Sequence, residues 1–178
     1  AGGKMGVRLA SNLIKSDHDV LHVEIDPAGQ KRLKDETGID CVEQGQALSN
    51  AEAVILAVPD RLIGKVLTGF VDDLKPGTAV IMLDAAAPHA ETLPKRDDIT
   101  YFVAHPCHPP LFNDEIDPDA KKDYFGGIAA KQHIICALGQ GPEEHYAMCE
   151  QIARDFYCPV MRSHRCTIEQ MAILEPAL

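Results

Sequence analysis

A continuous apolar run, "AVILAV" at Ala53–Val58, places the strongest constraint on how this chain can fold. A strand with one face in water alternates apolar and polar residues, whereas an unbroken apolar run is typical of a strand covered on both faces. Such strands occur in parallel sheets that lie between two layers of helices. The run is also far shorter than the ~20 apolar residues that a membrane-spanning helix needs. It therefore predicts an α/β protein.

Helix-like and strand-like segments alternate along the chain, as this fold class requires. Pro27 and Gly38 mark the start and the end of one helix, and the T-x-x-Q pattern from Thr167 to Gln170 is a capping box that begins the last one. Helices are predicted at 7–14, 27–37, 60–70 and 142–156 and from Thr167 onward. Strands are predicted at 19–25, 39–42, 51–58, 78–83, 99–104, 131–138 and 158–163. The pattern predicts a doubly wound, Rossmann-type fold with a mostly parallel sheet.

The chain opens with a glycine-rich turn, "AGGKMG", directly before the first predicted helix. Glycines in such a turn let the backbone approach a pyrophosphate, and the helix N-terminus adds amide donors and a positive dipole. The residues expected to bind a dinucleotide here are Gly2, Gly3, Lys4, Met5 and Gly6. Since no strand precedes the turn, we expect the first strand of the sheet to lie outside this sequence, and the chain to be clipped at both ends.

A carboxylate stands where a dinucleotide site needs one. Glu24 ends the second predicted strand region, where a carboxylate accepts hydrogen bonds from the adenosine ribose hydroxyls. Asp26 is the competing ribose ligand, and its charge would repel a ribose 2′-phosphate, which favours NAD over NADP. Val58 and Pro59 end the apolar strand and are expected to line the nicotinamide side of the crevice, unless they form a plain strand-to-helix turn.

The proline-rich stretch "HPCHPP" at 105–110 carries the main candidates for chemistry. His105 follows a predicted strand at the end of the sheet where ligands bind. An imidazole there can act as a general acid–base, a metal ligand or a hydrogen-bond donor to a carboxylate, and the prolines restrict the backbone that holds it. The expected catalytic residues are His105, His108 and Asp84. The alternatives are a stiff surface loop for the histidines and an N-cap for Asp84.

Two late carboxylates, Glu169 and Glu175, lie in the last predicted helix. Glu175 precedes Pro176, so the helix is expected to kink or end there and expose the side chain. We expect His105 and Glu175 to meet at one divalent, zinc-like metal ion, with substrate oxygens completing its shell. The alternative is that both glutamates belong to a solvated helix face.

The charge balance limits the possible partners. A formal net charge of −10 argues against a nucleic-acid surface, so an anionic ligand needs a local group of donors. Arg162, His164 and Arg165 form a compact basic cluster that would attract an anionic substrate, unless it is an ordinary surface cluster. The six cysteines contain no C-x-x-C pair and no signal sequence precedes them, which favours free thiols in the cytoplasm. No membrane partner is expected.

Several motifs resemble a known superfamily. "GGKMGVRLASNL", "HVEID", "VILAVPD" and "GTAVIMLDAAAP" are similar to the NAD-binding domain of the 6-phosphogluconate and 3-hydroxyisobutyrate dehydrogenases. "HPCHPPLFNDE" and "SHRCTIEQMAILEPA" resemble more specifically the D-apionate oxidoisomerase family. The resemblance implies an NAD-binding domain over 1–163. Over 164–178 it implies the start of an all-helical C-terminal domain that completes the substrate site and mediates homodimerisation. The catalytic lysine common in that region has no counterpart after Lys131.

Together, the motifs and the resemblance favour an NAD-dependent oxidoreductase of carbohydrate metabolism that acts on a CH–OH group. By resemblance, it oxidises a small, polyhydroxylated and branched sugar acid, D-apionate, and then isomerises the product to an oxo-acid. A divalent metal that holds two substrate oxygens would stabilise the charge. Two alternatives remain open. One is a plain 3-hydroxyacid or prephenate-type dehydrogenase in which His105 works without metal, and the other is a module that senses NAD without turnover.

Overall fold

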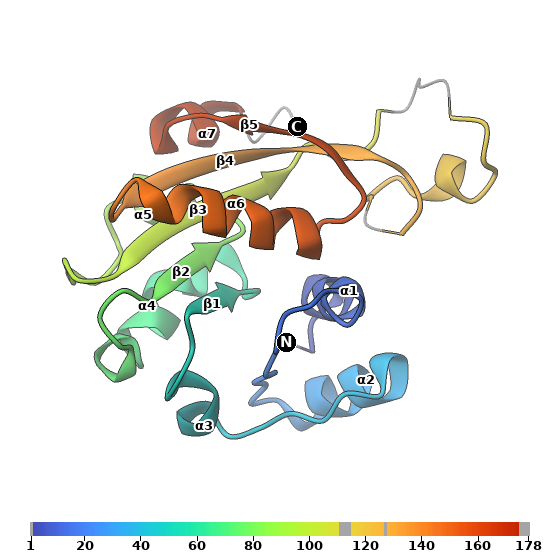
Figure 1. Ribbon diagram of the computed structural model, residues 1–178. Helices are drawn as coiled ribbons and strands as arrows, with labels where there is room; N and C mark the ends of the chain where they lie inside the picture. The colour runs from blue at the N-terminus through green and yellow to red at the C-terminus, as the bar shows by residue number, and fades with distance from the viewer. Residues whose placement is uncertain (1, 111–114, 127, 175–178) are drawn as a thin grey trace.

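The computed structural model describes residues 2–110, 115–126 and 128–174. A five-stranded sheet with the order β1-β2-β3-β4-β5 forms its centre (Figure 1). The strands are β1 Ala53–Leu56, β2 Ala79–Met82, β3 Thr100–Pro106, β4 Gln132–Gln140 and β5 Val160–Arg165. Neighbouring strands run parallel except for β3 and β4, which are antiparallel. The predicted mostly parallel sheet is confirmed.

Helices cover both faces of this sheet, which confirms the predicted Rossmann-type α/β arrangement. The helices are α1 Lys4–Leu13, α2 Pro27–Thr37, α3 Gln44–Leu48, α4 Ile63–Thr68, α5 Ala86–His89, α6 Glu144–Phe156 and α7 Ile168–Leu174, with short 3₁₀ turns at 60–62, 71–73 and 120–122. On one face, α1 and α6 pack against Phe102 and Ile134. On the other face, α4, α5 and α7 pack against Val103 and Ile135. No helix in the described segments is long and apolar enough to cross a membrane.

The structure confirms the predicted ends of α2 and the predicted start of α7. The Asp26 side chain accepts hydrogen bonds from the amides of the first turn of α2, which begins at Pro27, and Gly38 ends this helix with φ 78°. At α7, the Thr167 amide donates to Gln170 Oε1 at 3.0 Å, and the Gln170 amide donates to Thr167 Oγ1 at 3.1 Å. These are the two reciprocal bonds of a capping box.

The predicted strands at 19–25 and 39–42 are wrong as members of the sheet. Both segments lie outside it, and one backbone hydrogen bond, from the Val42 amide to the His22 carbonyl at 2.9 Å, links them. A strand needs a ladder of such bonds to a neighbour. Within the described residues, β1 pairs only with β2. Most of β1 is accordingly only partly buried, contrary to the expectation from its apolar sequence, whereas all of β2 is buried.

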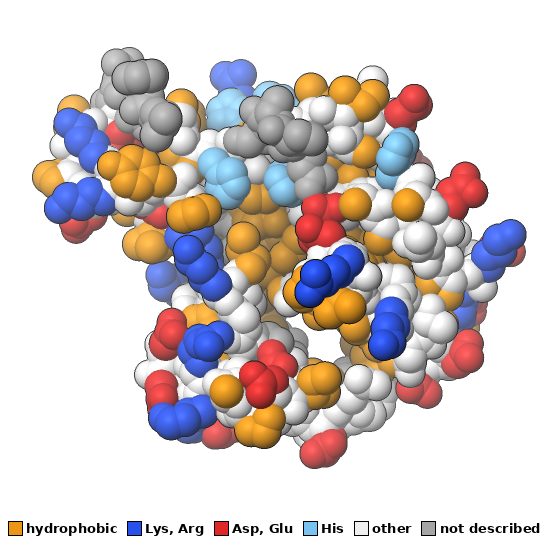
Figure 2. Space-filling view, turned by 180° about the vertical axis from the view of Figure 1, so that it is seen from behind, with side chains coloured by type: hydrophobic (Ala, Val, Ile, Leu, Met, Phe, Trp, Pro, Cys, Tyr) orange, Lys and Arg blue, Asp and Glu red, His pale blue; other side chains and the backbone are white. Residues whose placement is uncertain are grey.

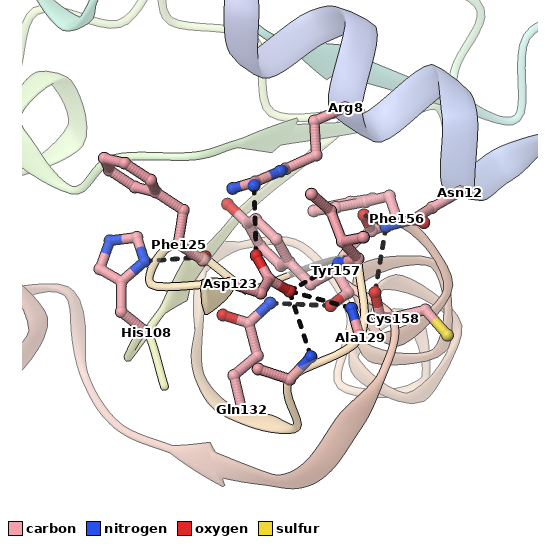
Figure 3. Close-up of polar contacts among 12 residues, drawn as sticks. Arg8, Asn12, His108, Asp123, Phe125, Ala129, Gln132, Phe156, Tyr157 and Cys158 are labelled. Atoms are coloured by element: carbon pink, nitrogen blue, oxygen red, sulfur yellow. Dashed lines mark hydrogen bonds and ion pairs between the residues drawn. The ribbon is translucent and has the colours of Figure 1, made fainter. Parts of the chain in front are cut away.

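Two buried amide side chains, from Asn12 on α1 and Gln132 on β4, bind the backbone at the end of α6 (Figure 3). Asn12 Nδ2 donates to the carbonyl oxygens of Phe156 and Cys158 at 3.0 and 3.1 Å. Gln132 Nε2 donates to the Tyr157 carbonyl at 2.8 Å. The carbonyls at the C-terminal end of α6 are thereby satisfied, and the Asn12 bonds give the glycine turn that precedes α1 a fixed position relative to the sheet.

The cysteines form no disulfide bonds. All six are free thiols, as the sequence predicted. Burial raises the pKa of Cys136 to about 12 and that of Cys149 to about 11, so both stay protonated. Protonated, buried thiols pack as small apolar side chains, and these two belong to the core between the sheet and α6.

Candidate active site

Polar side chains gather where the three parallel strands end. Asp60 follows β1, Asp84 follows β2, and His105 lies at the end of β3. The carboxyl ends of neighbouring parallel strands meet at one edge, which is the edge where open α/β sheets bind ligands. The His105 and Asp84 side chains are close enough to interact electrostatically, so the structure brings these two predicted catalytic residues together.

His105 has a defined tautomer and charge. Its Nδ1 lies 2.8 Å from the carbonyl oxygen of Leu83, and this acceptor requires a proton on Nδ1. Burial lowers the pKa of His105 below its ordinary value, although the Leu83 carbonyl and the Asp84 charge oppose part of that shift. The ring is therefore neutral near pH 7, with its lone pair on Nε2. That is the state of a general base.

Asp84 has a structural contact at this edge. Its Oδ1 accepts a hydrogen bond at 2.6 Å from the amide of Ala86, the first residue of the short helix α5. Ala85, and not Asp84, is the N-cap residue of α5, so the N-cap alternative is not observed as such. The bond to the Ala86 amide nevertheless fixes the carboxylate beside His105. Sequence reasoning did not single out Asp60 next to it. Desolvation and the nearby Asp84 carboxylate both raise the pKa of Asp60. Because the Asp60 side chain is exposed, the charge of Asp84 is the main cause.

His108 is held by its own loop. With a positive φ of 54°, it turns its Nδ1 to donate to the Phe125 carbonyl at 3.0 Å, and its ring meets the Phe125 ring edge-on (Figure 3). It lies near enough to His105 to affect the charge on that ring. Cys107 between the two histidines packs against the core, and burial raises its pKa. His105 is therefore the better placed catalytic group of the two histidines.

The glycine turn is shorter than predicted. Lys4, Met5 and Gly6 already belong to the first turn of α1, and Gly3 is its N-cap. A Cβ on Gly2 would lie 2.2 Å from the Gly29 carbonyl oxygen, so only glycine allows this approach to α2, whereas nothing lies within 4 Å of a Cβ on Gly3. No side chain caps the start of this ten-residue helix, and the space beside the Gly3 α-carbon is open, which suits an anion.

Glu24 lies beside this turn, as the sequence predicted. It accepts hydrogen bonds from the amides of Gly2 at 2.6 Å, Ile25 at 2.9 Å and Asp26 at 3.0 Å. Burial raises its pKa, whereas the hydrogen bonds from the amides of Asp26 and Gly2 lower it, and the resulting pKa lies well below its usual range. The competing Asp26 caps α2. Arg32, which sequence reasoning missed, donates from Nη1 to the Gly2 carbonyl at 2.8 Å.

The other predicted cofactor contacts lie at the end of β1. Val58 packs against the core and Pro59 is exposed, immediately before the turn that contains Asp60. They occupy the same sheet edge as His105, where a nicotinamide would have to lie for hydride transfer. A surface hollow of about 480 Å³ lies elsewhere, between α2 and residues 39–43, and none of the predicted site residues lines it.

The described residues give no support to the predicted metal ion. Its second ligand, Glu175, lies outside them. Among the residues that the structure does describe, no group of three or more His, Cys, Asp or Glu side chains is arranged to hold a metal. His105 instead uses one ring nitrogen for the Leu83 carbonyl. Glu169 is exposed on α7, as expected of a solvated helix face.

The late basic cluster divides between the two faces of the sheet. Arg165 forms a two-contact ion pair with Glu143 and stacks 4.2 Å above the Tyr146 ring, on the side of α6. Arg162 and His164 alternate with it along β5 and so face the other side. Figure 2 shows several histidine side chains close together on one face of the molecule, near a recess that contains hydrophobic side chains.

Comparisons with known proteins place this geometry among dehydrogenase-like folds. Residues 113–178 match the family described as phosphogluconate dehydrogenase (decarboxylating) C-term, and residues 1–88 match the family described as NADP oxidoreductase coenzyme F420-dependent. Two curated relatives named D-apionate oxidoisomerase, from Rhizobium rhizogenes and Cupriavidus necator, are 64% and 60% identical over the whole chain. The chain spans 65% and 64% of their lengths, slightly less than two thirds.

Solved structures agree with the fold. A semialdehyde dehydrogenase NAD-binding protein from Cupriavidus necator, in complex with calcium and NAD, is 60% identical with a TM-score of 0.97, over 99% of this chain and 64% of that one. A putative oxidoreductase from Jannaschia sp. CCS1 is 53% identical with a TM-score of 0.94, over the same shares of the two chains. An NADH-preferring ketol-acid reductoisomerase, 16% identical with a TM-score of 0.76 over 99% and 53%, shares the fold.

Proposed function

Because the chain belongs to the D-apionate oxidoisomerase family, we propose that it carries the NAD site and the catalytic histidine of an enzyme that oxidises D-apionate, a small branched sugar acid, and isomerises the product to an oxo-acid. The observation that carries the catalytic part is the neutral, oriented His105 at the carboxyl edge of the sheet. The six free thiols support a reducing compartment such as the cytoplasm.

The residues at the start of the chain fit an NAD cofactor. The open N-terminus of α1 at Gly3 offers amide donors to a pyrophosphate, and Glu24 offers an ionised carboxylate to the ribose hydroxyls. When bound, NAD supplies the hydride acceptor. Val58 and Pro59 would border the nicotinamide on the β1 side. That the similar Cupriavidus protein was solved in complex with NAD supports NAD as the cofactor.

The chain's own contribution to oxidation is the transfer and placement of a proton. As the substrate carbon loses its hydride, Nε2 of His105 takes the hydroxyl proton, and the carbonyl forms. The hydrogen bond to the Leu83 carbonyl keeps the His105 ring in one orientation during this step. Asp84, fixed by the Ala86 amide, lies beside the ring and stabilises the imidazolium that results. Calcium, which the Cupriavidus structure contains, prefers oxygen ligands, so the His105 nitrogen is not a suitable ligand for that ion.

The test is turnover by the purified full-length natural protein. With NAD present, we expect NADH formation, read at 340 nm, with D-apionate and clearly less with unbranched sugar acids. Mass spectrometry should show a product isomeric with the simple oxidation product. NADH formation with an ordinary 3-hydroxyacid at equal or higher kcat/KM would favour the plain dehydrogenase, and no NADH formation with any acid would favour an NAD-sensing module.

Glu24→Ala should weaken NAD binding by about 1–3 kcal/mol, or roughly 5- to 150-fold, because the ribose hydroxyls lose their acceptor. It should also reduce discrimination against NADP, since a negative charge near the 2′-position is removed. Calorimetric titration of both nucleotides measures the two effects. Asp40→Ala, an exposed carboxylate change elsewhere on the same half of the chain, is the control. Unchanged NAD affinity in Glu24→Ala would show that another group binds the ribose.

A further inference from the structure

Two histidines on neighbouring strands form a direct pair. His133 Nδ1 on β4 and His164 Nε2 on β5 lie 2.8 Å apart, and their rings stack with centroids 5.0 Å apart at 21°. A hydrogen bond between two ring nitrogens needs one donor and one acceptor, so the pair accommodates one imidazolium beside one neutral imidazole. His164 is exposed and His133 is partly buried. The proposed oxidation step does not use either of them.

A guanidinium lies next to this pair. Arg162 is the register partner of His133, and His164 follows it by two residues on the same strand. All three side chains therefore project from the same face of the sheet. Unlike Arg165, Arg162 makes no ion pair with any residue that the structure describes. In a chain with a formal net charge of −10, an exposed basic group without an acidic partner is available to a ligand.

The group lies on the same face as the catalytic histidine. His105 is the register partner of Ile135, and Ile135 is the register partner of His164. Two strand spacings of about 4.8 Å each put His105 and His164 about 10 Å apart at their backbones. A hydrogen bond of about 2.8 Å at each end of a molecule with a few carbon–carbon bonds spans such a distance.

We propose that His133, His164 and Arg162 form an anion subsite that binds the carboxylate of the sugar acid while His105 takes the proton from its hydroxyl. The inference rests on the proposed function, since it assigns one end of that substrate. A planar guanidinium can grip a carboxylate through two parallel N–H bonds, and an imidazolium adds a charge-assisted one. The subsite accordingly selects small hydroxy acids over the matching neutral polyols and esters.

The experiment compares Arg162→Gln with Arg165→Gln in the full-length natural protein with NAD. Arg165 lies on the same strand, but on the opposite face and in an ion pair with Glu143, so its variant is the matched control. Arg162→Gln should raise the KM for the sugar acid at least 10-fold and leave kcat and the KM for NAD within about 3-fold. His164→Asn should raise the same KM. The methyl ester of the acid has no carboxylate, so the wild type and Arg162→Gln should have similar KM values for it.

A second measurement does not depend on turnover. Glycerate, a small hydroxy acid, should shift the imidazole NMR signals of His133 and His164 in the wild type and in Arg165→Gln, but not in Arg162→Gln. An unchanged KM in Arg162→Gln, a rise in the KM for NAD instead, or signals that do not respond to glycerate would overturn the subsite. If the wild type oxidises no sugar acid, the proposed function fails, and the glycerate titration still decides whether the anion site exists.

Discussion

His105→Gln should lower kcat about 10²- to 10⁴-fold, the range expected for loss of a general base. Glutamine can still donate from its side-chain amide to the Leu83 carbonyl, but it has no nitrogen that takes up a proton near pH 7. The KM for NAD should stay nearly unchanged, because the residues that we propose to bind the nucleotide, the glycine turn and Glu24, belong to another part of the chain. Steady-state kinetics of the full-length protein measure these parameters.

The pH profile of the wild type supplies an independent check. Burial lowers the pKa of His105 below the ordinary 6.5, so the neutral base persists to a lower pH than in an exposed histidine. Activity should therefore fall on the acid side only as the pH drops through that lowered value. The unfolded chain binds this proton more readily than the folded one. The contribution of His105 to the free energy of unfolding is therefore lost as the pH falls, and not as it rises.

His18→Gln is the matched control for the first prediction. His18 is a more exposed histidine that pairs with Asp155 at 2.8 Å, near the C-terminal end of α6 and away from the strand ends. Its loss should change kcat less than 2-fold. If His105→Gln retained more than a tenth of the wild-type kcat with an unchanged acid limb, the base would have to be another group, and Asp60 with its raised pKa would be the next to test.

The sequence predicted those parts of the fold that depend on local chemistry. Pro27, Asp26 and Gly38 define α2 because a fixed φ, a capping carboxylate and a residue tolerant of positive φ act within one helix. Buried strands such as β2 are visible as apolar runs. The segments 19–25 and 39–42 failed because sheet membership depends on a partner strand, and a sequence pattern cannot supply the hydrogen bonds of that partner.

The sequence pointed to those candidate site residues whose position depends on the end of a strand. Asp84 and His105 could be found because each lies at the end of an apolar strand, at the edge that binds ligands. Glu24 could be found from its spacing to the glycine turn, although the segment before it does not join the sheet. The His133–His164 pair could not be found, since 31 residues separate the two and only the β4–β5 register brings them to 2.8 Å. The importance of Asp123 could not be predicted from the sequence either. It lies in a proline- and acid-rich segment that resembles an ordinary surface loop, yet its side chain is buried.

Asp123→Ala should lower the free energy of unfolding by about 3–5 kcal/mol, the cost typical of breaking a buried, hydrogen-bonded ion pair. Figure 3 shows why one carboxylate matters so much. Its Oδ2 accepts from the amides of Ile128, Ala129 and Ala130 at 2.9, 3.0 and 3.1 Å, and its Oδ1 lies 3.5 Å from Nη2 of Arg8. Alanine would leave three amides without an acceptor and Arg8 without its counter-charge.

The loss of stability should extend to the loop segment 115–126, which contains Asp123 and Phe125. Asp123 joins that loop to α1, and Phe125 two residues later accepts from His108 and carries the Lys4 ammonium 4.4 Å above its ring. Hydrogen exchange in Asp123→Ala should therefore quicken at 128–130, followed by a lower denaturation midpoint. Asp119→Ala, an exposed change on the same loop, should stay within about 0.5 kcal/mol of the wild type. Equal stability of the two variants would mean that other contacts, such as those of Phe125, hold the loop against α1.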